Sequence, residues 1–295
     1  LASDAAIWRL DNALGIFHPT GALSRDSIGR YLGKTVDFKD RYSIQRRSMN
    51  YSDEIKWDGE RIALRFQSPD EPRKLVLMAH GGPGGSMDGP GNLFSIIEER
   101  LTALNYATCR FDFRGAGNSS GSFGDVTLCS LKADLVRVKS WCAAKLDVPI
   151  LLLGESLGAT IALMATTDYK APMVLLWPAI ELRTTSFNGF MTDDALETLS
   201  STGHLMEDGL KISHQFIDEC MTLDLWPKLA HFKGRYFIAH GEQDRDVPVS
   251  QSDRLSKELG SRCAYLKISG AGHGAKDPES QEMVLTCVAE WIVTL

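Results

Sequence analysis

The segment Gly154–Gly158 constrains the fold of this 295-residue chain more than any other. It has the sequence GESLG, follows the apolar run Pro149–Leu153 (PILLL) and precedes the small-residue stretch Ala159–Ala165. A buried strand that turns sharply into a helix through G-x-S-x-G lifts one serine hydroxyl out of the backbone at the end of a sheet. Glycine tolerates the backbone angles and the close helix–strand approach of such a turn. The pattern therefore predicts a strand–turn–helix unit with Ser156 as a nucleophile.

From about residue 42 onward, short β-rich runs alternate with helical patterns, which is typical of an open, mostly parallel α/β sheet. We expect a doubly wound, mostly parallel sheet of eight strands, in which the first two form a hairpin-like antiparallel edge. The expected strands are Tyr42–Met49, Arg61–Gln67, Lys74–Ala79, Tyr106–Phe113, Pro149–Leu153, Met173–Trp177, Arg235–Ala239 and Ala264–Ile268. The expected helices are Leu93–Leu104, Leu128–Lys145, Leu157–Thr167, Ser250–Leu259 and Pro278–Val293.

One interval, residues 178–233, is far longer than the usual connection between two strands. Its length predicts a helical lid inserted over the carboxyl ends of the strands. The expected domain organisation is thus an N-terminal extension (1–41), a core formed by 42–177 and 234–295, and the lid insertion 178–233.

Composition excludes several classes of partner. The formal net charge is −6 and the isoelectric point is near 5.7, without any run of like charges, which argues against nucleic acid or an anionic membrane as the main partner. No apolar stretch approaches the roughly 20 residues of a spanning helix, and the start lacks a basic-then-apolar signal. We expect a cytoplasmic protein without a membrane span. The chain begins at Leu1 rather than methionine, so we expect it to be trimmed, processed or part of a longer protein.

A serine hydroxyl is a weak nucleophile at neutral pH, so Ser156 needs a base, and that base needs a partner to orient it. Two later segments supply candidates. The strand expected at Arg235–Ala239 continues into HGEQDRDVP, which places Asp244 and Asp246 in the loop after it. The next strand continues into ISGAGHG, which places His273 in a glycine-rich loop. The order serine, acid, histidine is that of the α/β-hydrolase triad.

On these motifs the chain resembles the α/β-hydrolase superfamily over roughly residues 42–295. In that family HGxxDxxVP carries the triad acid at its first aspartate, so the resemblance implies Asp244 as the acid, with Asp246 as the alternative. The N–H of Leu157, directly after the nucleophile, is one expected oxyanion donor. The resemblance implies the N–H of Gly82, in HGGPGGS, as the other.

Two further histidines and one further loop belong to the same strand ends. His80 and His240 each begin an HG pair, and we expect them to hold loops rather than to act as the base. The segment Asp112–Gly121 (DFRGAGNSSG) resembles a loop of the same superfamily, and we expect Asp112 and Arg114 to form a structural pair. No phosphate-binding or metal-ligand spacing is present, so we expect no cofactor and no metal.

The expected activity is hydrolysis of a carboxylic ester or thioester through an acyl-serine intermediate. The segments around SGSFGDVTLCSLKADLVRVKSWC and HGEQDRDVP resemble cinnamoyl-esterase-like and acyl-carrier-protein thioesterase-like members of the superfamily. The expected partner is a small-molecule acyl substrate, free or bound to a carrier. Trp177 and Trp226, near the two ends of the insertion, are the predicted substrate-binding residues.

Two alternatives stay open. HGGPGG resembles the oxyanion loop of proline iminopeptidases, although the insertion lacks an obvious glutamate cluster that would hold a free amino terminus. Its glutamates are Glu181, Glu197, Glu207 and Glu219. The other alternative is acyl transfer to an alcohol or amine, as in a release or cyclising thioesterase that acts on a carrier-bound chain.

Overall fold

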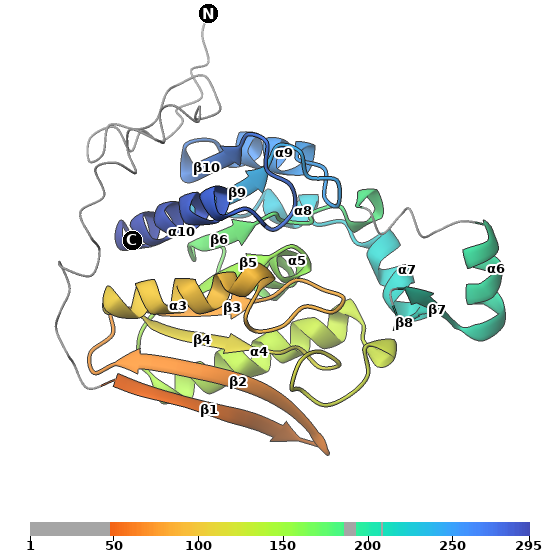
Figure 1. The fold of residues 1–295 in the computed structure, drawn as a ribbon, viewed down its shortest axis with the longest axis horizontal. Helices are drawn as coiled ribbons and strands as arrows, with labels where there is room; N and C mark the ends of the chain where they lie inside the picture. Colours follow the sequence, from red (N-terminus) through yellow and green to blue (C-terminus); the bar gives the residue numbers. More distant parts are fainter. Residues whose placement is uncertain (1–47, 186–192, 208) are drawn as a thin grey trace, which may run out of the picture.

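The computed structural model describes residues 48–185, 193–207 and 209–295. Within them, eight strands form one sheet in the order β1-β2-β4-β3-β5-β6-β9-β10 (Figure 1). The six strands from β4 to β10 run parallel, and β1 and β2 form an antiparallel edge. The strands are β1 (Ser48–Trp57), β2 (Glu60–Pro69), β3 (Leu75–Ala79), β4 (Ala107–Phe111), β5 (Ile150–Glu155), β6 (Met173–Leu176), β9 (Tyr236–Gly241) and β10 (Cys263–Ile268). This confirms the predicted doubly wound, mostly parallel sheet.

Helices cover both faces of the sheet, because strand residues alternate between two apolar clusters. Val76 and Met78 of β3 pack with α3 (Leu93–Ala103) and α10 (Pro278–Val293). Leu75 and Leu77 of the same strand belong to the cluster that includes side chains of the remaining core helices. Those helices are α4 (Leu128–Lys145), α5 (Leu157–Ala165) and α9 (Ser250–Leu259). Figure 1 shows α3 and α10 side by side on one face and α4 on the other.

The first strand differs from its prediction. We expected it at Tyr42–Met49, whereas β1 extends from Ser48 to Trp57 and pairs along its length with β2. The predicted residues 42–47, like the N-terminal extension 1–41, lie outside the described residues. The two strands are joined at Asp58 and Gly59, both with positive φ (44° and 78°), which is the backbone of a tight two-residue hairpin turn.

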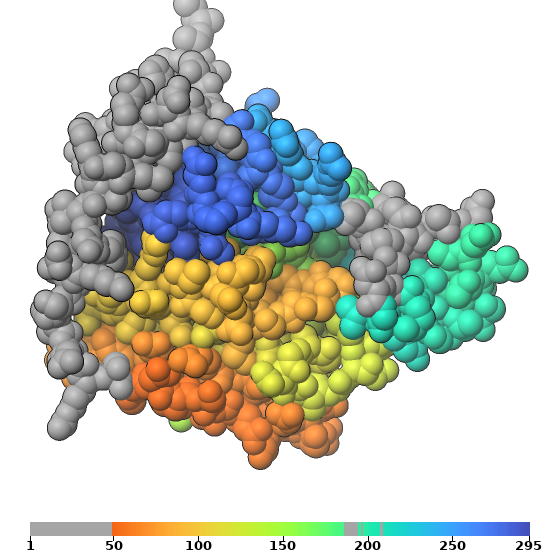
Figure 2. Space-filling model, viewed as in Figure 1, coloured from red at the N-terminus to blue at the C-terminus, as the bar shows by residue number. Residues whose placement is uncertain are grey.

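The interval between β6 and β9 contains more than helices. It holds η4 (Leu182–Thr184), α6 (Asp193–Thr202), the hairpin β7 (His204–Glu207) with β8 (Leu210–Ser213), α7 (His214–Thr222) and α8 (Trp226–Leu229). The β7–β8 hairpin was not predicted. In Figure 2 the turquoise residues of this insertion extend from one end of the body beside the yellow-green loop that follows β4.

The insertion contacts the body at that loop. The ring of Phe216 in α7 lies 5.4 Å from that of Phe123 in η3 (Phe123–Asp125), centroid to centroid, edge on. Ser213 Oγ donates a hydrogen bond to the carbonyl oxygen of Val126 at 3.3 Å. The insertion is therefore anchored next to the loops at the carboxyl ends of the strands.

Among the helices of the described residues, none combines the length and apolar composition that crossing a membrane requires.

Candidate active site

Ser156 lies at the turn between β5 and α5, with φ 53° and ψ −119°. A non-glycine residue rarely adopts such angles, and residues that do so are held in place by the surrounding structure. Here the Ser156 N–H donates to the carbonyl oxygen of Leu176 in the neighbouring strand β6, at 2.9 Å. The turn thus fixes the backbone of the serine and leaves its side chain partly exposed.

The two glycines of GESLG are required by close backbone contacts. A Cβ at Gly158 would lie 2.1 Å from the carbonyl oxygen of Ala79 at the end of β3. A Cβ at Gly154 would lie 2.6 Å from the Cα of Ala159. Both contacts are shorter than any that a real Cβ makes, so α5 can pack this close to β3 and β5 only with glycine at these positions.

The loops after β9 and β10 bring Asp244 and His273 to the serine. His273 Nε2 lies 3.1 Å from Ser156 Oγ, and His273 Nδ1 lies 2.7 Å from Asp244 Oδ2. The three side chains that we predicted from separate segments therefore form one continuous hydrogen-bonded chain. In this arrangement Nδ1–H donates to the carboxylate, which leaves Nε2 free to accept the serine proton.

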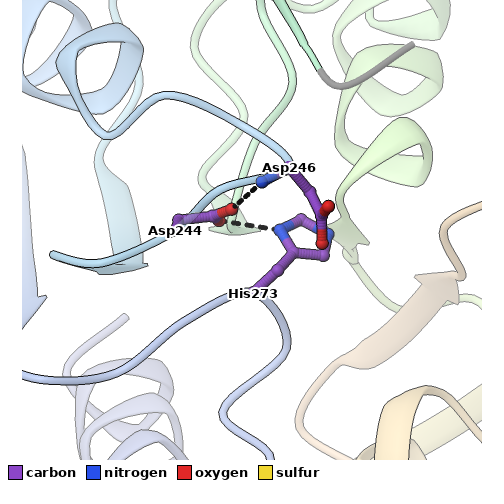
Figure 3. A group of neighbouring side chains, drawn as sticks. All are labelled: Asp244, Asp246 and His273. Atoms are coloured by element: carbon purple, nitrogen blue, oxygen red, sulfur yellow. Dashed lines mark hydrogen bonds and ion pairs between the residues drawn. The ribbon is translucent and has the colours of Figure 1, made fainter. Parts of the chain in front are cut away.

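The two candidate acids have different environments (Figure 3). Asp244 Oδ1 accepts the backbone N–H groups of Asp246 and Val247, at 2.8 and 2.9 Å, while its Oδ2 faces His273. The side chain of Asp246 is exposed to solvent. The carboxylate that is held by the loop and bonded to the imidazole is that of Asp244.

The charges around His273 determine its protonation. Burial lowers the pKa of His273, but its hydrogen bond to Asp244 and the negative charges of Asp244, Glu155 and Asp246 outweigh burial, so the pKa lies above its ordinary value. For Asp244, burial raises the pKa, and hydrogen bonds from His240 and His273 bring it well below its usual range. The acid therefore stays ionised and the base binds its proton more tightly than a free imidazole.

The other two strand-end histidines hold loops, as predicted. His240 is fully buried, and its Nε2 lies 3.0 Å from the carbonyl oxygen of Val247 and 3.1 Å from Asp244 Oδ2. His80 Nε2 accepts the N–H of Phe113 at 3.1 Å, and burial lowers its pKa. Neither imidazole makes a hydrogen bond to Ser156 within the described part of the chain.

Asp112 and Arg114 do not pair with each other, contrary to our expectation. Asp112 accepts the N–H groups of Met87 and Asn118, at 2.6 and 2.8 Å, so it joins the loop after β3 to the loop after β4. Arg114 instead forms an ion pair with the buried Asp134 of α4. Asp112 therefore holds two loops together, and Arg114 is bound to helix α4.

The predicted oxyanion donors lie next to each other. A Cβ at Gly82 would be 3.3 Å from Leu157 Cδ2, so the loop after β3 lies against the start of α5. Leu157 is the first residue of α5, where a backbone N–H has no partner within the helix. Neither N–H makes a hydrogen bond to another described residue, whereas the preceding Gly81 N–H donates to Glu155 Oε2 at 2.7 Å. Their role as oxyanion donors stays a prediction.

Glu155 belongs to the site and was not predicted. It precedes the nucleophile, only 5% of it is exposed, and its Oε1 lies 3.7 Å from His273 Nε2. The signal was present in the sequence, since Glu155 is the one charged residue between Pro149 and the end of α5 at Ala165. A charge within such an apolar stretch indicates a specific partner.

The two predicted substrate-binding tryptophans have other contacts. Trp177 is fully buried, and its ring lies edge on to that of His273, with centroids 6.3 Å apart. Trp226 Nε1 donates to Glu181 Oε1 at 2.6 Å, and the guanidinium of Arg254 lies 3.6 Å from the centroid of its ring. Substrate contact by either residue stays a prediction.

One group of side chains in the described residues could supply three metal ligands. Asp244, Asp246 and His273 each offer one atom, and these atoms lie within 4.8 Å of one another (Figure 3). Asp244 and His273 already hydrogen-bond to each other, and Nε2 of the histidine faces Ser156. The acid–base pair accounts for this grouping without a cation.

Comparison with known proteins places this site in a family context. A family profile described as "Serine aminopeptidase, S33" matches residues 70–208. The chain is 23% identical over 270 residues to a monoacylglycerol lipase of Mycolicibacterium smegmatis, covering 80% of this chain and 94% of that protein. It is 27% identical over 139 residues to the mitochondrial palmitoyl-protein thioesterase ABHD10 of Bos taurus, covering 43% of this chain and 44% of that protein.

The fold matches solved structures over a larger share of the chain. Est1E from Butyrivibrio proteoclasticus, solved with ferulic acid bound, superposes with a TM-score of 0.71 at 26% identity, covering 82% of this chain and 98% of that one. Mouse ABHD10 superposes with a TM-score of 0.66 at 18% identity, covering 83% and 99%. The sheet order and these matches show that the chain has the α/β-hydrolase fold.

Proposed function

We propose that this protein hydrolyses carboxylic esters or thioesters through an acyl-serine intermediate, with Ser156 as nucleophile, His273 as base and Asp244 as the acid that orients it. The observation that carries the proposal is the hydrogen-bonded chain from Ser156 Oγ through the imidazole of His273 to Asp244 Oδ2, at 3.1 and 2.7 Å. The proteins to which the chain is similar include a monoacylglycerol lipase, a palmitoyl-protein thioesterase and Est1E with ferulic acid bound. The first two names denote enzymes that cleave an ester and a thioester bond, and ferulic acid is a carboxylic acid of the kind that ester cleavage releases.

The reaction follows from the positions of these atoms. Ser156 Oγ attacks the acyl carbon while its proton moves to His273 Nε2, and the oxyanion accepts hydrogen bonds from the N–H groups of Gly82 and Leu157. His273 then gives the proton to the departing alkoxide or thiolate, which leaves an acyl-serine. Water attacks that ester with the same base assistance, so the products are a carboxylic acid and free Ser156. Asp244 stays ionised and stabilises the imidazolium in both steps.

The insertion, residues 178–233, serves as the lid of this site. The support is its position beside the loop His80–Ser86, which carries Gly82 and is called the oxyanion loop below: a Cβ placed on Gly84 of this loop would lie 3.5 Å from Leu210 Cδ1 of β8. The substrate is a small molecule with an apolar acyl group, since the apolar side chains of Phe123, Leu157 and Leu210 border the loop at Gly82 and Gly84. A cytoplasmic location stays a prediction.

Aminopeptidase activity is the second candidate, because the profile that matches residues 70–208 is described as a serine aminopeptidase. An exopeptidase needs a carboxylate free to bind the substrate ammonium. Glu181 Oε1 already accepts from Trp226 and Arg254, and Glu219 Oε2 accepts the N–H of Cys129 at 3.2 Å. These contacts favour ester hydrolysis over aminopeptidase activity.

A substrate panel tests the proposal. It contains nitrophenyl esters of short, medium and long acyl chains, an aryl-acrylate ester, an acyl thioester and a prolyl anilide, each measured with the wild type and Ser156→Ala. We expect ester or thioester turnover that the variant loses while its thermal unfolding is unchanged. Anilide turnover alone would assign the protein to the aminopeptidases. Labelling by a fluorophosphonate at a residue other than Ser156 would contradict the nucleophile assignment. Transfer of the acyl group to an added alcohol or amine in preference to water would indicate an acyltransferase.

A further inference from the structure

Glu155 is a buried carboxylate at the centre of the site, and the hydrolytic mechanism above does not use it. It is the last residue of β5, paired with Leu176 of β6, and its side chain is 7% exposed. Placing a carboxylate in such a position is unfavourable unless hydrogen bonds and charges compensate for the lost hydration. Its contacts therefore indicate what this residue contributes.

Each oxygen of Glu155 faces a different part of the catalytic machinery. Oε2 accepts the N–H of Gly81 at 2.7 Å, and a Cβ at Gly81 would lie only 2.5 Å from that oxygen. Gly81 directly precedes Gly82, the proposed oxyanion donor. Oε1 lies 3.7 Å from His273 Nε2, the atom that would carry the serine proton. Among the described residues, His273 is the only group that can form an ion pair with Glu155, and it does so when protonated.

We propose that Glu155 is a positioning residue with two roles: one oxygen holds the oxyanion loop through Gly81, and the other stabilises His273 when it is protonated. The inference rests on the proposed hydrolase mechanism, since it assigns both roles within that reaction. The imidazole then lies between two carboxylates, with Asp244 at Nδ1 and Glu155 near Nε2. The second carboxylate faces the nitrogen that becomes charged only during turnover.

The surrounding charges set the expected strength of this effect. The carboxylates that act on the imidazole are those of Asp244, Asp246 and Glu155, while His80 contacts the loop at the Gly81 carbonyl. α5, which starts directly after Ser156, carries no charged side chain. The pKa of Glu155 lies above its ordinary value, because burial and the charge of Asp244 raise it by more than His273 and the Gly81 N–H lower it. A neighbouring opposite charge at this distance typically moves the pKa of its partner by about one unit or more.

Glu155→Gln separates the two roles. The glutamine keeps an oxygen that can accept from Gly81 but has no charge for His273. Glu155→Met has a side chain of similar length and removes both the charge and the acceptor, so it leaves the Gly81 N–H unpaired. Comparing the two variants distinguishes the electrostatic role from the loop-holding role.

The first measurement needs no substrate. The pKa of His273 is followed by NMR of isotope-labelled histidine, with its signal identified by its disappearance in His273→Gln. We expect the pKa of His273 to fall by about one unit in Glu155→Gln. Asp246→Asn, which removes an exposed charge from the same site, should give a smaller decrease because solvent screens it. An unchanged or raised pKa in Glu155→Gln would overturn the electrostatic role.

The second measurement is the pH dependence of turnover. In Glu155→Gln we expect the maximal kcat to fall about tenfold at unchanged KM, while the acidic limb of kcat/KM moves about one unit to lower pH. A residue with a merely structural role would lower activity without moving the pH profile. Glu155→Met should lose a further tenfold or more in kcat, and equal kcat in both variants would overturn the loop-holding role.

The two proposals can fail separately. If no ester or thioester is hydrolysed by the wild type, the NMR measurement still shows whether Glu155 acts on His273. If Ser156→Ala abolishes hydrolysis but Glu155→Gln keeps the wild-type pH profile and kcat, the hydrolase proposal stands and the role of Glu155 is wrong. If Glu155→Met does not fold, Glu155→Gln alone decides the electrostatic role. Glu155→Ala, which also removes the acceptor for the Gly81 N–H, then replaces Glu155→Met in the test of the loop-holding role.

Discussion

Three carboxylates act on His273, and their combined effect determines how activity depends on pH. Asp244 contributes most, through both its hydrogen bond and its charge, and Glu155 and Asp246 add smaller effects in the same direction. Burial acts against them, as it does for any buried imidazole. Because the carboxylates outweigh burial, the imidazole holds its proton at a pH where a free histidine has begun to lose it.

The pH profile of kcat/KM should therefore have an acidic limb above pH 6.5. The base must be neutral to accept the Ser156 proton, and the pKa of His273 is raised above 6.5. Activity is then full at alkaline pH and is lost as the pH falls through this raised pKa. Steady-state kinetics from pH 5 to 9 measure the midpoint, and a midpoint below 6.5 would contradict the charge arrangement described above.

Neutralising the two aspartates of the β9 loop should have unequal effects. Asp244→Asn removes the charge that stabilises the imidazolium, and we expect kcat to fall by about three to four orders of magnitude. Asp246→Asn removes an exposed charge and should cost about threefold at most. The pair serves as its own control, because both changes are isosteric and lie two residues apart. Equal losses in the two variants would mean that the acid is not Asp244 alone.

Gly158, at the turn between β5 and α5, is a glycine whose replacement should lower the stability of the protein. In Gly158→Ala the new methyl group would lie 2.1 Å from a backbone oxygen of β3 that cannot rotate away. We expect a loss of about 3 kcal/mol in the free energy of unfolding, since α5 must move outward. Urea denaturation followed by circular dichroism measures this loss. Gly272→Ala is the matched control, because its nearest neighbouring atom is 3.9 Å away, and it should change stability by no more than about 1 kcal/mol.

Helices whose ends are marked by capping residues were predictable from the sequence. The helices at Leu128–Lys145, Ser250–Leu259 and Pro278–Val293 have the predicted bounds. For the first, the side chain of Thr127 accepts the N–H of Ser130 and the Ser130 side chain accepts in return, which fixes where α4 begins. The proximity of Ser156, Asp244 and His273 was likewise predictable, because each follows a buried strand and the carboxyl ends of parallel strands meet at one edge of a sheet.

Other features depend on contacts that the local sequence does not encode. β1 is an edge strand with several polar, exposed residues, so its apolar pattern is weak, and the Asp58–Gly59 turn was the better indicator of its position. The β7–β8 hairpin has four-residue strands that are stabilised by packing on η3. Glu155 was missed because its partners, Gly81 and His273, are 74 and 118 positions away.

The insertion and the body meet around the oxyanion loop, and this contact is where substrate selectivity should arise. Leu210 of β8 lies beside the loop at Gly84, while Phe123 of η3 lies near Gly82 and packs on Phe216 of α7. Apolar side chains of the insertion and of the body thus border the same loop. An acyl chain that extends from Ser156 past Gly82 would contact both.

Truncating Leu210 should therefore change the response to acyl chain length. We expect Leu210→Ala to lower kcat/KM about fivefold for medium and long nitrophenyl esters, which corresponds to about 1 kcal/mol of lost apolar contact, and to leave the acetate almost unaffected. Met206→Ala is the matched control, since Met206 lies in the other strand of the hairpin with 60% of its surface exposed, and both substrates should react as in the wild type. An equal decrease for acetate and the long esters in Leu210→Ala would mean that Leu210 only holds the oxyanion loop in place. Chain-length selectivity that is lost in Leu210→Ala and kept in Met206→Ala would instead identify the β8 face of the hairpin as part of the acyl-binding surface.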